Sequence, residues 1–146
     1  MTADRVLNMG SVLVEVIDAA GVCRSARRFA NLVVDGGLAW IASRMVAAPA
    51  AMSHMAIGFN QTAVAAWNTG LYQEAARAPL ESATQAGAVS TYVATFQPGT
   101  AIGQVAELGI FNAASGGTML NRVAFPPQGK NSSDTVKVTW TVTQSV

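Results

Sequence analysis

The sequence predicts a mainly β protein, an antiparallel β-sandwich or jelly-roll-like domain of about eight strands with one short α-helix at about residues 36–46. The clearest observation is the stretch 105–142, which reads as three short strands split by two turns. In its last strand Val136, Val138 and Trp140 fall on one face, with threonines and a lysine on the other. Such alternation is typical of an antiparallel strand with one buried and one solvated face. Turn-forming residues recur roughly every 8 to 12 residues elsewhere, as in a sandwich.

The chain begins with an expected N-terminal arm, residues 1–10, followed by a hairpin at residues 11–30. The first strand of the hairpin alternates valines with other side chains and ends at the sequence Asp18-Ala-Ala-Gly21. Aspartate and glycine at these spacings favour a tight turn. The second strand is therefore expected to return antiparallel from Val22.

This returning strand carries the densest positive charge of the chain, at Arg24, Arg27 and Arg28. One interpretation is a docking patch for an acidic partner. The other is a solvated strand edge that charge protects from pairing with other chains, and the pattern favours this second interpretation.

One helix is predicted after residue 31. Asp35 can serve as its N-cap, because a short side chain with an oxygen can accept a hydrogen bond from the first free backbone N–H groups. The apolar residues that follow have helical spacing: Leu38, Ile41, Ala42 and Met45. The match to this spacing is confined to one segment, so a single short helix is expected.

The middle of the chain alternates loops and short strands. The elements expected there are a loop at 47–51, a strand at 54–59 in which Gly58 permits a bend, a polar connection at 60–69, a short helical turn within 70–78, and strands at 80–84 and 89–97. Further on, Ser115-Gly116-Gly117 between two apolar strands predicts a tight hairpin, in which Asn112 and Gly116 can both accept a positive φ.

Glu107 is the most informative carboxylate, since it lies inside an apolar strand. If it points inward it needs a partner such as Arg122 or Arg77, because an unpaired buried charge is costly. The alternative is exposure on the solvated face of the strand. Glu107, Arg122 and Trp140, which falls on a predicted core face, are the candidate structural residues.

Composition narrows the function classes. The chain has 146 residues, the size of one domain, and no linker or composition shift divides it. Nine Lys and Arg against eight Asp and Glu leave a net charge of +1, so no nucleic-acid partner is expected. The sequence contains no run of ~18 apolar residues, so no membrane-spanning helix is predicted. Charged residues make up only 12% of a chain that is 51% hydrophobic, so we expect part of its surface to be covered in use.

No catalytic, cofactor or metal site is predicted, and we expect a protein that is not an enzyme. His54 is the one histidine and lies beside two methionines in an apolar strand, where a packed or hydrogen-bonded role is the commoner one. The carboxylates are scattered singly, without a close sequence pair for acid and base chemistry. Cys23 is the one cysteine, which excludes an intrachain disulfide and favours a buried or idle thiol. The start of the chain lacks the pattern of a signal peptide, so synthesis in the cytoplasm is expected.

Several short motifs follow one another in a defined order. They are Asn31 with Gly37-Leu38, Ala56-Ile57-Gly58, Gly70-Leu71 through Glu74 to Arg77, Glu107-Leu108-Gly109-Ile110-Phe111, and Val138-Thr139-Trp140-Thr141. In this order, over residues 31–143, the chain resembles small bacteriophage virion proteins related to the N-terminal, collar-like attachment domain of tail fibres. A fibre also needs a shaft and a receptor-binding tip, which these residues do not contain. The resemblance therefore implies an attachment module that docks on a larger virion surface, made in the cytoplasm of a host bacterium.

Two placements follow from the resemblance. The first is a capsid decoration or cement protein bound to the major capsid protein, and the alternative is an adaptor at the tail, collar or baseplate. A homo-oligomer is expected in either case. The rival class is a carbohydrate-binding sandwich, for which Trp67, in a polar loop, is the aromatic residue free to stack on a sugar.

Overall fold

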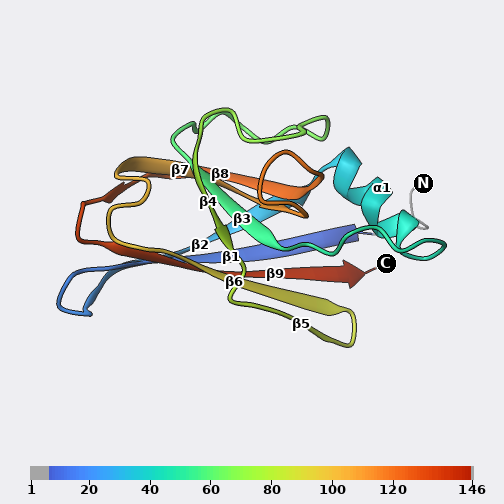
Figure 1. The fold of residues 1–146 in the computed structure, drawn as a ribbon, viewed down its shortest axis with the longest axis horizontal. Coiled ribbons are helices and arrows are strands. Elements are labelled where there is room, and N and C mark those ends of the chain that lie inside the picture. The colour runs from blue at the N-terminus through green and yellow to red at the C-terminus, as the bar shows by residue number, and fades with distance from the viewer. Residues whose placement is uncertain (1–6, 146) are drawn as a thin grey trace.

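The predicted mainly β fold is confirmed by a computed structural model that describes residues 7–145, in which nine strands and one short helix are found (Figure 1). In chain order the elements are β1 (Leu7–Ile17), β2 (Cys23–Val33), α1 (Asp35–Ser43), β3 (His54–Gly58), β4 (Glu74–Pro79), β5 (Ser82–Ala86), β6 (Val89–Phe96), β7 (Gly103–Phe111), β8 (Met119–Lys130) and β9 (Thr135–Ser145).

The strands form one curled antiparallel sheet in the order β4-β3-β7-β8-β2-β1-β9-β6-β5. Its middle is narrow, because β2 and β8 pair only at Leu32 with Arg122 and at Val33 with Asn121. The sheet folds over at this narrow point, so that β4-β3-β7-β8 and β2-β1-β9-β6-β5 face each other as the two layers of a sandwich-like fold.

The core lies between these layers and is built by strand alternation. Along β1 every second residue, Val12, Val14 and Val16, is buried. β9 contributes Val136, Val138, Trp140 and Val142 in the same way. β1 and β9 pair along their whole lengths, from Leu7 opposite Ser145 to Ile17 opposite Thr135, so the first and last described residues lie side by side (Figure 1).

The two edge strands of the sheet, β4 and β5, are joined by only Leu80 and Glu81. The backbone N–H of Leu80 donates to Ser53 O (2.9 Å), and that of Glu81 donates to Val93 O (2.7 Å). These two residues therefore carry the chain from the edge of one layer to the edge of the other.

Helix α1 covers one end of the sandwich. A side chain at Gly37 would place its Cβ 2.0 Å from the backbone oxygen of Leu120, so glycine allows the helix to lie directly on β8. The N-cap is Val34, without a side-chain cap, and Asp35 lies in the first turn, where its charge favours the helix dipole. The prediction of Asp35 as N-cap was therefore wrong by one residue, and the helix ends at Ser43, earlier than expected. It is too short to cross a membrane, and the described chain contains no other helix.

Three further expectations are corrected. The helical turn expected within 70–78 is wrong, because the alanine-rich segment 74–79 pairs with β3 as β4, and strand pairing outweighs local helix propensity. β1 begins at Leu7, inside the expected arm, whose residues 1–6 lie outside the described chain. In the β7–β8 hairpin, Gly116 (φ 61°) and Gly117 (φ 76°) adopt the positive φ, whereas Asn112 Oδ1 accepts a hydrogen bond from the backbone N–H of Thr118.

Candidate functional site

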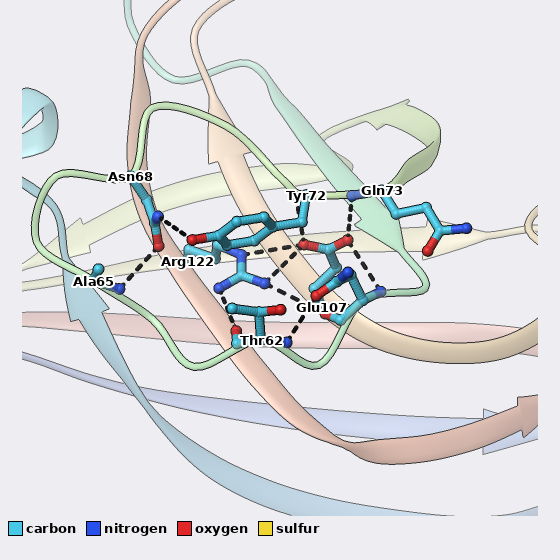
Figure 2. Close-up of polar contacts among 8 residues, drawn as sticks. Thr62, Ala65, Asn68, Tyr72, Gln73, Glu107 and Arg122 are labelled. Atoms are coloured by element: carbon cyan, nitrogen blue, oxygen red, sulfur yellow. Dashed lines mark hydrogen bonds and ion pairs between the residues drawn. The ribbon is translucent and has the colours of Figure 1, made fainter.

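Glu107, on β7, is fully buried and forms an ion pair with Arg122, on the neighbouring strand β8 (Figure 2). Arg122 Nη2 and Nε donate to Glu107 Oε1 at 2.9 and 3.1 Å. Both side chains have no exposed surface. Of the two arrangements left open by the sequence, the inward one is observed, with Arg122 as the partner.

Glu107 also accepts three hydrogen bonds from the backbone of one long loop, residues 59–73. The N–H of Tyr72 donates to Oε1 at 2.9 Å, and those of Gln73 and Asn60 donate to Oε2 at 2.8 and 3.2 Å. One carboxylate therefore fixes both ends of this loop, as Figure 2 shows.

Arg122 fastens the same loop from the other side. Its guanidinium donates to the backbone oxygens of Thr62 (2.8 Å) and Asn60 (3.3 Å). The Tyr72 ring lies 4.6 Å from the guanidinium carbon, a cation–π contact that covers the charge. Because both members of the ion pair have several partners, the desolvation cost of burying them is offset.

The tip of the loop is held by Asn68, which is itself buried. Its Oδ1 accepts from the backbone N–H of Ala65 (2.9 Å), and its Nδ2 donates to the hydroxyl of Tyr72 (3.2 Å). The backbone N–H of Asp35, at the start of α1, donates to Ala66 O (2.7 Å). Trp67 therefore projects from a braced loop beside α1, with 70% of its surface exposed.

Two glycines make room for this arrangement. A Cβ at Gly58 would lie 2.5 Å from both Glu107 Oε2 and the backbone oxygen of Gln73. A Cβ at Gly109 would lie 3.1 Å from the side chains of Leu71 and Met119. Both positions therefore favour glycine for reasons of space, and both belong to the short motifs identified in the sequence.

Arg77, the other partner considered for Glu107, has a different role. It pairs with Glu74 at 2.8 Å and stacks on the Phe111 ring, 3.8 Å from its centroid. Its Nη1 also donates to the backbone oxygens of Ala113 and Gly116, each at 2.9 Å. Arg77 thus braces the β7–β8 hairpin next to the Glu107 site.

The arginines of β2 lie at the opposite end of the sandwich. Arg24 donates to Gly129 O (2.7 Å) and to the carboxylate of Asp134, which joins β2 to the ends of β8 and β9. β2 is an interior strand in the sheet order, so the expected charge-guarded edge exists only over residues 23–31, where β8 does not pair with it. Arg27 and Arg28 are exposed.

The ion pair at this end shifts the pKa of Asp134 below its ordinary value, chiefly through the hydrogen bond from Arg24 and then through that from the backbone of Asn131. Burial lowers the pKa of the nearby Lys130, whose Nζ donates to Gln97 O at 2.9 Å. This cluster joins the ends of β2, β6, β8 and β9 and, unlike the Glu107 site, holds no long loop.

The remaining candidate residues are dispersed. Trp140 is fully buried in the core, and Trp40 donates through Nε1 to Ala50 O (2.9 Å). His54 is half-buried, with Nδ1 2.8 Å from Ser53 Oγ. Cys23 is exposed, so of the two expected alternatives, a buried or an idle thiol, the buried one is wrong. Among residues 7–145, no group of three or more histidine, cysteine, aspartate or glutamate side chains is placed to hold a metal ion.

The sequence missed most of the loop contacts. The donors and acceptors of Asn60, Thr62 and Gln73 are backbone atoms, which leave no mark on residue type. The available signal was indirect: a glutamate in an apolar strand together with Gly58, which leaves the space that its carboxylate occupies.

No known protein family, curated protein or solved structure matches this chain.

Proposed function

We propose that this chain is a non-enzymatic structural protein of a bacteriophage virion, which docks on a larger assembly, in the first instance as a capsid decoration or cement protein. One observation carries the proposal. Three of the five motifs whose order resembles phage attachment domains, those at 56–58, 70–77 and 107–111, are separate in the sequence and meet around the Glu107–Arg122 pair. Gly58 and Gly109 give the pair and its loop the space they need, and Arg77 braces the adjoining hairpin.

What these residues build is suited to binding rather than to chemistry. The loop 59–73 is fixed by a buried ion pair, so its tip loses little conformational freedom when a partner binds. The tip presents Trp67, and the neighbouring segment around α1 exposes Leu38, Met45 and Val46, at 42, 84 and 89%. Aromatic and methionine side chains are enriched in protein interfaces. We call Trp67 with these three residues the loop–helix surface.

The capsid is preferred to the tail because a small docking domain suits a repetitive lattice. Each copy contributes a modest apolar contact, and many copies, or a homo-oligomer, reinforce a shell by multivalent binding. The expected partner is then the major capsid protein. The alternative is a tail, collar or baseplate adaptor, which the likeness to tail-fibre attachment domains favours. Neither placement calls for a nucleic acid, a membrane or a cofactor.

The test is quantitative mass spectrometry of purified phage particles separated into heads and tails. Hundreds of copies on heads would support decoration, and a few copies on tails would support the adaptor. Absence of the chain from both fractions would refute the virion proposal.

The exposure of Trp67 also fits the carbohydrate-binding alternative, since an exposed indole can stack on a sugar ring. Substitution Trp67→Ala separates the two. A docking protein carrying it should bind particles more weakly and show no change on a glycan array. A carbohydrate-binding protein should lose array binding and keep its assembly state.

A further inference from the structure

A groove with a volume of about 400 Å³ opens between α1 and the β5–β6 hairpin, away from the Glu107 site. Its apolar wall includes Trp40 and Met52 on one side and Tyr92 and Val142 on the other. The size is within the range of protein pockets that bind small molecules or peptide side chains. One rim of the groove is β5 itself, through Ala83, Thr84 and Gln85.

Strand β5 is the last strand in the sheet order and pairs with β6 on one side only. Its sequence, Ser-Ala-Thr-Gln-Ala, contains no charge and no proline, and all five residues are exposed. Proteins usually protect a free strand edge with charged residues or proline, because the unpaired N–H and C=O groups of the edge can bind another strand. The other edge strand, β4, has that protection in Glu74, Arg77 and Pro79. β5 is therefore the unprotected edge of the described sheet.

The groove carries one charged side chain among its lining residues, that of Arg44. Its guanidinium carbon lies 5.6 Å from the centre of the Trp40 ring, and Nη1 donates to Pro49 O at 2.8 Å. These contacts hold the cation at the mouth of an otherwise uncharged groove. A carboxylate on the occupant would complement it.

We infer that this groove binds an extended peptide segment of a partner protein, which adds to β5 as a further strand. Backbone hydrogen bonds to β5 supply affinity, apolar side chains on one face of the peptide enter the groove, and an acidic side chain or terminal carboxylate meets Arg44. The inference deepens the docking function proposed above and rests on it for the source of the peptide, but not for the binding chemistry.

The probe is a library of short randomised peptides, selected on the immobilised full chain. Peptides that bind the wild type should alternate apolar and polar residues and carry an acidic group near one end. The groove is blocked with Ala83→Trp, which adds an indole at an exposed position on its rim. The matched control is Ala19→Trp, an exposed alanine in the β1–β2 turn at the opposite end of the molecule (Figure 1). Binding should weaken at least about tenfold in the first variant and stay unchanged in the second.

Two further comparisons test the mode of binding. N-methylation of every second backbone nitrogen of a selected peptide should abolish binding in one register and leave it in the other, since only alternate N–H groups of a strand face its neighbour. Arg44→Gln should weaken binding of acidic peptides about threefold to tenfold and leave their amide counterparts unchanged. Bound peptide should also slow hydrogen exchange of the β5 amides.

Three results would overturn the inference. They are a failure to enrich any peptide over the Ala83→Trp variant, equal binding of the two N-methylated isomers, and dimerisation of the chain through β5 without peptide binding, which would make a second copy the occupant. Peptide binding by a chain that is absent from purified particles would leave the groove intact and refute the virion proposal. If the chain is present in particles but binds no peptide, the virion proposal stands and the peptide-binding groove is refuted.

Discussion

Glu107 and Asn121 are both fully buried polar residues on neighbouring strands, yet their surroundings are opposite. Glu107 lies under the loop 59–73 and accepts five hydrogen bonds, two from Arg122 and three from the backbone. Asn121 pairs in register with Ile110 and Val33, two core residues, so its side chain is on the inner face of the sandwich. Among the described residues, neither its Oδ1 nor its Nδ2 has a hydrogen-bond partner.

The same interior contains more unpaired polar atoms. Within residues 7–145, the amide group of Asn31 and Nε1 of Trp140 also lack partners. The amide of Asn31 occupies the space over Gly10, two residues before the buried Val12 on the inner face of β1. The two regions teach that burial alone does not decide whether a polar group stabilises the fold. The number of hydrogen-bond partners decides it. A buried charge with all its partners can leave the free energy of unfolding unchanged or raise it, whereas a buried amide without partners lowers it.

The largest effect is expected from Glu107→Gln. The substitution keeps the shape of the side chain but leaves the Arg122 guanidinium buried without a counter-charge. The free energy of unfolding should fall by about 3–5 kcal/mol, measured by urea denaturation. The matched control is Glu81→Gln, at an exposed carboxylate, which should change it by less than about 0.5 kcal/mol. Equal effects of the two substitutions would contradict the role of the ion pair.

The next largest effect is expected from Gly58→Ala. The new methyl group would meet Glu107 Oε2 and the backbone oxygen of Gln73, so one end of the loop 59–73 must shift. We expect a loss of about 1–3 kcal/mol in the free energy of unfolding and faster hydrogen exchange at the amides of Tyr72 and Gln73. Gly70→Ala, in the same loop but facing open space, is the control and should cost nothing or stabilise slightly.

Asn121→Leu should act in the opposite direction. Leucine has a similar branched shape and removes two polar atoms that have no partner on the inner face. Thermal and urea unfolding should show a gain of about 1 kcal/mol, which is the desolvation cost of an unsatisfied amide less some crowding from the larger side chain. A fall of 1 kcal/mol or more in the free energy of unfolding is about the cost of removing an existing hydrogen bond. It would show that the Asn121 amide has hydrogen-bond partners in solution.

The smallest effect concerns Asp134 and depends on pH. Its folded-state pKa is below the ordinary value, so the ionised form stabilises the fold. That contribution is complete above the unfolded-state pKa of about 4 and is lost as the pH falls through the lower folded-state pKa. Asp134→Asn should therefore flatten the acid limb of a stability–pH curve and leave the rest of its shape intact. An unchanged acid limb would show that other carboxylates set it.

The sequence pattern predicted those parts of the molecule in which apolar residues are buried and polar residues are exposed. The alternation around Trp140 placed β9 correctly, because a strand with one dry face imposes a period of two. It failed at residues 74–79, where alanines carry no strand signal and pairing with β3 decides the structure. At the site, charge balance anticipated Arg122 as a partner of Glu107. The long-range backbone donors, and the asparagines inside the core, could not be read from the pattern because both depend on how distant segments meet.

The adjacency of the first and last described residues has a mechanical consequence. Leu7 lies opposite Ser145 at one end of the antiparallel β1–β9 ladder. A force that pulls these two residues apart would load the ladder at that end and open its hydrogen bonds one pair after another, as a zipper opens. A force applied along opposite directions of neighbouring strands would instead load many hydrogen bonds at once. The domain should therefore resist a force that shears neighbouring strands past each other better than a force that pulls Leu7 and Ser145 apart.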